Sequence, residues 1–342
     1  MNKLKSIVRD NILQLSPYSS AREEYYSSKE ILLDANENPY GLLNRYPDPF
    51  QNKLRASLSK MKKISKASIF IGNGSDQIID LAFRVFCNPG IDKALTFIPT
   101  YGMYQVSADI NNVELIKLAL NKDFQIKKEG LKALFKNPSI KLLFLCSPNN
   151  PTGNCINKED ILFLAENFSG VVIIDEAYID FSSKPSTIQL INSFPNLIVV
   201  QTLSKAWGLA GARIGIAYSN PELIGLFNKI KPPYNVSELN QKAACEALAK
   251  KQDYINQKRA ILNEKEKLVN QLDEIEEVIK VFPSETNFLL VQFKNPKKIV
   301  RRLQKNRIIV RDRTKEIEGC LRITVVTAKE NKLLVNKLKQ IK

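Results

Sequence analysis

The feature that most constrains the fold is a regular alternation of short apolar runs with helical patterns between about residues 29 and 235. The runs have the length of buried strands, and a loop or helical pattern follows each one. They occupy residues 69–71, 94–97, 142–146, 171–174 and 197–201. Strands that alternate with helices predict an α/β fold, with a mostly parallel sheet flanked by helices on both faces. The ligand site of such a sheet lies at the carboxyl ends of its strands.

The pattern changes after residue 237. Residues 238–277 favour helix, since Ala, Leu, Glu, Lys and Gln dominate there. Strand patterns follow at 278–282, 288–293, 308–310 and 321–326, and helical patterns at 296–304 and 329–341 alternate with them. A chain of 342 residues also exceeds the size of one ordinary core. We therefore expect an N-terminal arm (1–28), a large domain (29–237) and a smaller α+β domain (238–342).

Composition excludes several classes of protein. Apolar residues make up 44% of the chain, which is enough for a sizeable core, yet no run reaches the 18 residues of a membrane span. The first twenty residues lack the apolar segment of a secretory signal. The five cysteines are scattered and show no C-x-x-C spacing, which argues against a disulfide framework or a zinc site. We expect a cytoplasmic protein without a metal or a membrane partner.

The formal net charge is +16. Such a charge favours either an anionic partner or a lysine-rich solvated surface. The lysines look evenly spread, with no dense block and no recognised DNA-binding module, so the sequence favours the solvated surface and no nucleic-acid partner. A nucleic-acid-binding protein on a reused scaffold is the alternative from another functional class. Histidine is absent, so acid–base chemistry must use Lys, Asp, Glu, Tyr or Cys.

Two loops that follow strand patterns suit the binding of a ligand. Residues 72–76 (Gly-Asn-Gly-Ser-Asp) precede a helical pattern, whose free N–H groups and positive dipole end favour a phosphate. Residues 147–153 (Ser-Pro-Asn-Asn-Pro-Thr-Gly) form a rigid loop that fixes Asn150 as a hydrogen-bond donor. Ordinary turns are the alternative interpretation of both loops.

Charged residues at other strand ends complete the pattern. Asp175 ends a buried run, where a carboxylate needs a partner such as a cationic ring nitrogen, unless it caps a helix or faces solvent. Lys205 lies between Ser204 and Arg213 in a segment of small residues, so it can be a nucleophilic amine beside a phosphate grip. Arg322 lies inside an apolar run, where an arginine requires an anionic partner. The partner is either a carboxylate or phosphate of a ligand or a carboxylate of the protein in an internal salt bridge. A phosphate grip, a ring-nitrogen carboxylate and an amine nucleophile are the parts of a pyridoxal 5'-phosphate site.

Longer motifs carry a resemblance that runs in order from about residue 33 to 324. The chain resembles the fold-type I aminotransferases and, within them, the histidinol-phosphate aminotransferases. The Ser-Lys-x-x-Gly-Leu-x-Gly-x-Arg-x-Gly spacing is typical of the superfamily. The matching segments are residues 33–41, 45–48, 72–76, 99–101, 147–153, 175–178, 204–215, 231–236, 285–288 and 321–324. Val325-Val326 departs from the Val-Gly that often follows in the family.

The resemblance implies a role for each matching residue. Lys205 would hold the cofactor as a Schiff base and shuttle the substrate proton, and Asp175 would pair with the pyridine nitrogen. Asn150 and Tyr178 would bind the ring hydroxyl, and Tyr101 would stack on the ring. The cofactor phosphate would be held by Gly74, Ser75, Asp76, Thr202, Ser204, Arg213 and Tyr46, the last from a neighbouring subunit of a homodimer.

The resemblance also implies a substrate and a reaction. Arg322 would bind the carboxylate of glutamate, while Arg311, Tyr18 and Asn287 would help to recognise a phosphorylated substrate. The implied reaction converts L-histidinol phosphate and 2-oxoglutarate to imidazole-acetol phosphate and L-glutamate in histidine biosynthesis. A threonine-phosphate decarboxylase and an aromatic amino-acid aminotransferase are alternatives on the same scaffold.

Overall fold

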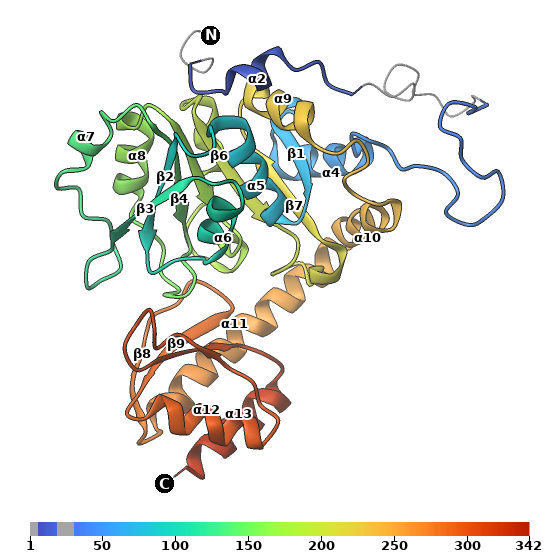
Figure 1. Ribbon diagram of the computed structural model, residues 1–342. Coiled ribbons are helices and arrows are strands. Elements are labelled where there is room, and N and C mark those ends of the chain that lie inside the picture. The colour runs from blue at the N-terminus through green and yellow to red at the C-terminus, as the bar shows by residue number, and fades with distance from the viewer. Residues whose placement is uncertain (1–5, 19–30, 342) are drawn as a thin grey trace.

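The computed structural model describes residues 6–18 and 31–341, and the fold has two sheets with separate cores (Figure 1). The larger sheet has seven strands in the order β1-β7-β6-β5-β4-β2-β3. The strands are β1 (Ile69–Asn73), β2 (Lys93–Ile98), β3 (Glu114–Ala119), β4 (Ile140–Cys146), β5 (Val171–Asp175), β6 (Leu197–Thr202) and β7 (Ile214–Tyr218). Only β7 runs antiparallel to its neighbours β1 and β6, so the prediction of a mostly parallel sheet is confirmed.

Helices cover both faces of this sheet because its buried strands are apolar on both sides. In β5, Val172 and Ile174 join the core on one face, whereas Val171 and Ile173 join the core on the other. The covering helices are α2 (Asp10–Gln14), α4 (Asn52–Lys62), α5 (Ser75–Phe86), α6 (Met103–Ile110), α7 (Leu131–Leu134), α8 (Lys158–Asn167), α9 (Pro221–Ile230) and α10 (Glu238–Ala249). Short 3-10 turns add η1 (Lys66–Ser68), η2 (Ile179–Phe181), η3 (Thr187–Asn192) and η4 (Ala210–Ala212).

The second sheet is antiparallel, with the strand order β10-β11-β9-β8. Its elements are α11 (Lys251–Asp273), β8 (Val278–Val281), β9 (Phe288–Phe293), α12 (Pro296–Lys305), β10 (Arg311–Asp312), β11 (Cys320–Thr324) and α13 (Ala328–Lys339). In Figure 1, α12 and α13 lie on the side of this sheet that is turned away from the large domain. This matches the expected α+β pattern except at 308–310, where the backbone of Ile308 closes the end of α12 and the strand begins only at Arg311.

The long helical region after residue 237 divides into two helices at Lys250. Helix α10 packs against α4 and η4, and its Ala244 belongs to a core of the large domain. Helix α11 then carries the chain to the second core, which begins with Leu268 and Leu272. Within residues 6–18 and 31–341, no helix combines the length and the apolar character that a bilayer crossing requires.

Candidate active site

One cavity lies at the carboxyl ends of β4, β5 and β6, beside the first turn of α5. It gathers ten of the residues that the sequence singled out, from five separate segments of the chain. The lining residues are Ser75, Asp76, Tyr101, Cys146, Asn150, Asp175, Ala177, Tyr178, Thr202, Ser204, Lys205 and Arg213. The cavity therefore stands where a parallel sheet is expected to bind its ligand.

Asp175 is the last residue of β5, and its carboxylate is 3% exposed. The buried phenol of Tyr104 donates a 2.9 Å hydrogen bond to its Oδ2, and the backbone N–H of Ala177 donates one of 3.1 Å to Oδ1. Desolvation raises the pKa of Asp175 to about 6, although both hydrogen bonds favour the charged form. A cation beside this carboxylate would therefore be bound strongly.

The first turn of α5 borders the same pocket through Ser75 and Asp76. Gly74 is the N-cap, at φ 79° and with no side chain to cap the helix, so the first backbone N–H groups are available to an anion. The loop is held close to β7: a Cβ on Gly215 would lie 2.3 Å from the carbonyl carbon of Gly74. Glycine at 215 is thus required by the close approach of two backbones.

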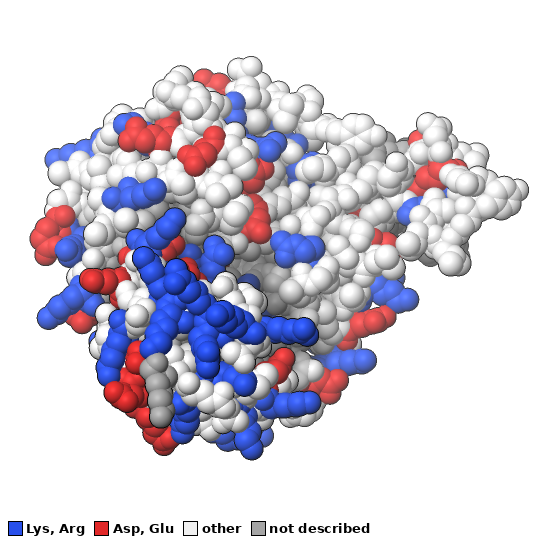
Figure 2. Space-filling model, turned by 60° about the horizontal axis from the view of Figure 1, so that its bottom comes forward, with Lys and Arg blue, Asp and Glu red and all other residues white. Residues whose placement is uncertain are grey.

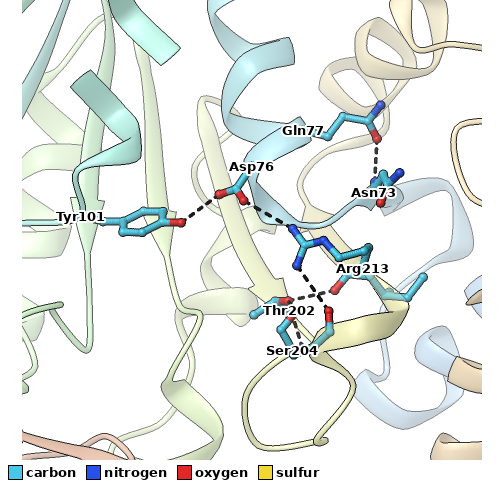
Figure 3. A network of polar contacts seen from close by, with 9 residues as sticks. Asn73, Asp76, Gln77, Tyr101, Thr202, Ser204 and Arg213 are labelled. Atoms are coloured by element: carbon cyan, nitrogen blue, oxygen red, sulfur yellow. Dashed lines mark hydrogen bonds and ion pairs between the residues drawn. The ribbon is translucent and has the colours of Figure 1, made fainter. Parts of the chain in front are cut away.

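Side chains of four segments meet over this turn, as Figure 3 shows. Asp76 accepts a 3.1 Å hydrogen bond from the hydroxyl of Tyr101, and its other oxygen lies 3.5 Å from Nη2 of Arg213. The Thr202 hydroxyl donates to the carbonyl of Ile214 (2.9 Å) and accepts from the backbone N–H of Ser204 (3.1 Å). The guanidinium of Arg213, the hydroxyl of Ser204 and the helix N-terminus form a suitable donor set for a phosphate, and Thr202 fixes the position of Ser204.

Lys205 follows β6 in the turn between β6 and η4. Its Nζ lies 5.5 Å from the centre of the Tyr178 ring. Desolvation, and next the positive charge of Arg322, lower the pKa of this amine. A lowered pKa increases the fraction of neutral amine, the form that attacks a carbonyl.

Arg322 reaches this site from the small domain. Its Nη1 donates a hydrogen bond to Oδ1 of Asn150, and its guanidinium lies 5.3 Å from the centre of the Phe288 ring. Burial lowers the pKa of the guanidinium, and no carboxylate pairs with Arg322 in the part of the chain that is described. A partly buried guanidinium without a carboxylate partner favours binding of an anionic group of a ligand.

A buried carboxylate fixes the loop behind the site. Glu176, next to Asp175, accepts hydrogen bonds from Ser186 Oγ (2.5 Å), from the backbone and hydroxyl of Thr187 (2.6 and 2.7 Å) and from Gln201 Nε2 (2.8 Å). Gln201 lies in β6, four residues before Lys205. Glu176 therefore ties the end of β5 to the strand that delivers Lys205.

Four residues named from the sequence lie away from this cavity, whereas Gly74 and Arg322 are next to residues that line it. Tyr46 stacks on Tyr234, with ring centres 4.4 Å apart, in a separate groove. Tyr18 is 70% exposed and lies near α2 and α9. Asn287 and Arg311 belong to the small domain: the Asn287 carbonyl accepts a bond from Val325, and Arg311 pairs in register with Arg322.

Sequence reasoning missed three contributors. Tyr104 supplies the hydroxyl that binds Asp175, Phe288 lies under Arg322 and at right angles to Tyr178, and Cys146 lines the cavity. Tyr104 follows Tyr101 by three residues in a helical pattern, and this spacing indicates that both side chains lie on the same side of the helix. No local sequence pattern indicates that Phe288 and Cys146 belong to the site.

Comparison with known proteins places this geometry in a class. The sequence profile of the family "Aminotransferase class I and II" matches residues 18–338. The chain belongs to this family.

Full-length relatives narrow the assignment. The chain is 47% identical to a curated histidinol-phosphate aminotransferase of Parabacteroides distasonis, and the alignment covers 100% of both chains. It therefore belongs, within the class, to the histidinol-phosphate aminotransferases, and the resemblance described above is confirmed.

Solved structures agree with this fold. A histidinol-phosphate aminotransferase of Sinorhizobium meliloti, in complex with pyridoxal-5'-phosphate, is similar with a TM-score of 0.80 at 26% identity, over 87% of this chain and 83% of that one. An L-threonine-O-3-phosphate decarboxylase of Porphyromonas gingivalis has a TM-score of 0.74 at 24% identity, over 87% and 93%. The second likeness shows the shared fold alone.

Proposed function

We propose that this enzyme transfers the amino group of L-histidinol phosphate to 2-oxoglutarate, giving imidazole-acetol phosphate and L-glutamate in histidine biosynthesis. The observation that carries the proposal is one cavity that contains Lys205, Asp175 and Arg213 in a chain of this family. The amine, the carboxylate and the guanidinium serve three different parts of one cofactor.

Pyridoxal 5'-phosphate fits the residues present. Its phosphate suits the first turn of α5 with Arg213, Ser204 and Thr202, and its ring nitrogen suits the buried carboxylate of Asp175. When bound, the cofactor supplies an aldehyde that accepts an amino group and a ring that withdraws electrons from the substrate Cα. The phosphate donors and Asp175 flank the position of Lys205, which supports covalent attachment at its Nζ.

The protein's own groups then position the substrate and move its proton. Lys205, once released from the cofactor, is the amine that would remove the Cα proton, since the chain contains no histidine. Asn150 and Tyr178 would hold the ring hydroxyl, and Tyr101 would lie against the ring. Arg322 would bind the carboxylate of glutamate or 2-oxoglutarate, and its bond to Asn150 would yield to that carboxylate.

Recognition of the phosphorylated substrate is assigned to Arg311, Asn287 and Tyr18. Arg311 lies directly opposite Arg322 in the β10–β11 ladder, so both guanidinium groups belong to one end of the small sheet. Two cations at this end suit substrates that carry a phosphate or two carboxylates. Tyr18 would have to approach from its exposed position, from the same subunit or from a second one.

A second copy of the chain would complete the site. The segment before α4 exposes large apolar side chains, which soluble monomers rarely do in one stretch. Apart from the end at Tyr46, which stacks on Tyr234, it stands away from the rest of the chain (Figure 1). Its exposed side chains are Ile31, Leu33, Tyr40, Leu42, Leu43 and Tyr46. We infer a cytoplasmic homodimer in which this segment brings Tyr46 to the cofactor phosphate of the partner.

Mixed dimers test both the sharing and the roles. A mixture of Lys205→Ala with Tyr46→Ala subunits should recover activity, because one of the two sites then has an intact Lys205 and an intact Tyr46. Neither variant alone should approach that level. No recovery on mixing, with heterodimers demonstrated by mass spectrometry, would refute a shared site.

The reaction itself is tested with purified enzyme, the cofactor and L-histidinol phosphate, with and without 2-oxoglutarate. Formation of glutamate in step with loss of histidinol phosphate is expected. Release of carbon dioxide from threonine phosphate without any 2-oxo acid would favour the decarboxylase. Turnover of aromatic amino acids alone would favour the aromatic aminotransferase.

A further inference from the structure

The segment from residue 294 to 315 is strongly basic. It carries ten lysines and arginines and one carboxylate, Asp312, a net +9 within a chain of formal net charge +16. The even spread of cations expected from the sequence is therefore wrong for this segment. The cations are Lys294, Lys297, Lys298, Arg301, Arg302, Lys305, Arg307, Arg311, Arg313 and Lys315. We call this set the basic surface.

The basic surface covers α12, β10 and the turns next to them. Figure 2 shows lysine and arginine side chains gathered on the small domain, on the face brought forward from the bottom of Figure 1. Nine of the ten residues are exposed, and Arg313 is half-buried. Lys297, Arg301 and Lys305 follow one another at intervals of four, so they form a stripe along one side of α12.

This surface leads to the candidate active site. Lys297, at the start of α12, and Lys315 lower the pKa of Asp312, after the two hydrogen bonds from Thr314. The neighbour of Asp312 in β10 is Arg311, which pairs in register with Arg322 of β11. Arg322 in turn bonds Asn150 at the edge of the cavity. Arg311 is thus the member of the basic surface that is paired with the arginine at the site.

We propose that the basic surface attracts the anionic substrates electrostatically and guides them to Arg311 and Arg322. This inference rests on the proposed function, whose substrates are a phosphate monoester and a dicarboxylate. Charges on one side of a site raise the local concentration of oppositely charged ligands and their association rate, by ten- to a thousandfold in strong cases. The α12 stripe would act without touching the bound substrate.

Small anions fit this surface better than a nucleic acid does. Between 294 and 315 the chain has no Phe, Tyr or Trp on which bases could stack. The surface instead includes Arg311, whose strand partner Arg322 bonds Asn150 at a cavity that receives a small ligand. The experiment must therefore distinguish binding of a polyanion such as DNA from electrostatic guidance of the small substrates.

The test uses the full-length holoenzyme and a triple variant, Lys297→Gln, Arg301→Gln and Lys305→Gln. The matched control is Lys60→Gln, Lys63→Gln and Lys66→Gln, three exposed lysines before β1 and hence at the end of the sheet opposite the cavity. Steady-state kinetics with L-histidinol phosphate and 2-oxoglutarate are measured from about 10 mM to 300 mM NaCl. Screening shortens the reach of exposed charges from about 30 Å to under 10 Å over this range.

The α12 variant should lose kcat/KM by roughly three- to tenfold at low salt, with kcat unchanged, and should converge with the wild type at high salt. The control variant should follow the wild type throughout. Equal salt slopes for all three proteins would overturn the proposal. So would an unchanged KM together with weaker retention of a DNA duplex, which would assign the surface to a polyanion. No transamination by the wild type would instead refute the proposed function.

Discussion

The hydroxyl of Tyr104 donates a 2.9 Å hydrogen bond to Oδ2 of Asp175, and both side chains are buried. Tyr104 comes from α6 and stacks on Phe144 of β4, with ring centres 5.0 Å apart, so its hydroxyl has a fixed position. Burial raises the pKa of the phenol, which therefore stays a donor. A neutral donor stabilises the carboxylate of Asp175 without neutralising it, which leaves its charge for the cofactor ring.

The buried carboxylate of Asp175 should make the stability of the apoprotein depend on pH. Burial raises its pKa from 3.8 to about 6, so the folded protein holds a proton that the unfolded chain has lost in this window. Stability should therefore fall by roughly 3 kcal/mol as the pH rises from about 4 to 6. Asp175→Asn should lack this fall and should bind the cofactor more weakly. Urea unfolding at pH 4.5 and 7.5 checks the difference, and parallel changes in both proteins would contradict it.

A methyl group at Gly215 should displace the first turn of α5, which we expect to bind the cofactor phosphate. The added Cβ would lie 2.3 to 2.4 Å from the backbone of Gly74 and Ser75, so the first turn of α5 must move. We expect Gly215→Ala to weaken cofactor binding by at least about tenfold, which corresponds to about 1.4 kcal/mol.

Gly211→Ala is the control for this substitution. Gly211 lies in the same segment, but its added Cβ would meet no atom within 4 Å. Cofactor affinity, measured by titration of the apoprotein, should therefore be close to that of the wild type. Equal cofactor affinities of the two variants would show that the contact between Gly215 and Gly74 is unimportant for binding the cofactor phosphate.

Arg322→Ala should impair the half-reaction with glutamate. Removing one partner of a charge-assisted, partly buried pair costs about 2 to 5 kcal/mol, so kcat/KM for glutamate should fall by at least about thirtyfold. Arg322→Lys should recover little, because an ammonium cannot bind a carboxylate in the bidentate manner. Single-turnover kinetics give the comparison, and undiminished use of glutamate would assign its carboxylate to another cation.

The Glu176 network should contribute to stability more than to chemistry. Glu176→Ala leaves the donors of Ser186, Thr187 and Gln201 without their acceptor, and we expect a loss of about 3 kcal/mol in the free energy of unfolding. Glu176→Gln keeps one acceptor oxygen and should lose less. Glu166→Ala, an exposed carboxylate on α8, should change stability by less than about 0.5 kcal/mol. Urea unfolding of the three variants should give that order, and a different order would refute the role.

Sequence patterns predicted most of the large sheet because its parallel strands are continuous apolar runs. The pattern did not reveal β3, an edge strand that contains no buried residue. It also missed β7, which follows the Lys205 segment directly and reads as its continuation. The antiparallel place of β7 between β1 and β6 depends on long-range pairing, which no local pattern encodes.

The candidate site was predictable to the extent that its residues stand at strand ends. Asp175 ends one buried strand and Lys205 follows another, so sheet topology alone brings them together. Tyr104 and Phe288 contribute through helix placement and domain packing, which the sequence does not show. The sequence does not show the basic surface, because apolar residues interrupt its cations, and the fold of α12 and β10 gathers them on the small domain (Figure 2).

Covalent attachment of the cofactor at Lys205 can be tested by chemical trapping. The protein is loaded with pyridoxal 5'-phosphate, treated with borohydride, which fixes a carbonyl compound to the amine that holds it, and digested for mass spectrometry. We expect a single phosphopyridoxyl adduct on the peptide that contains Lys205, and no adduct on folded Lys205→Ala. An adduct on another lysine, or none on Lys205, would show that Lys205 does not hold the cofactor.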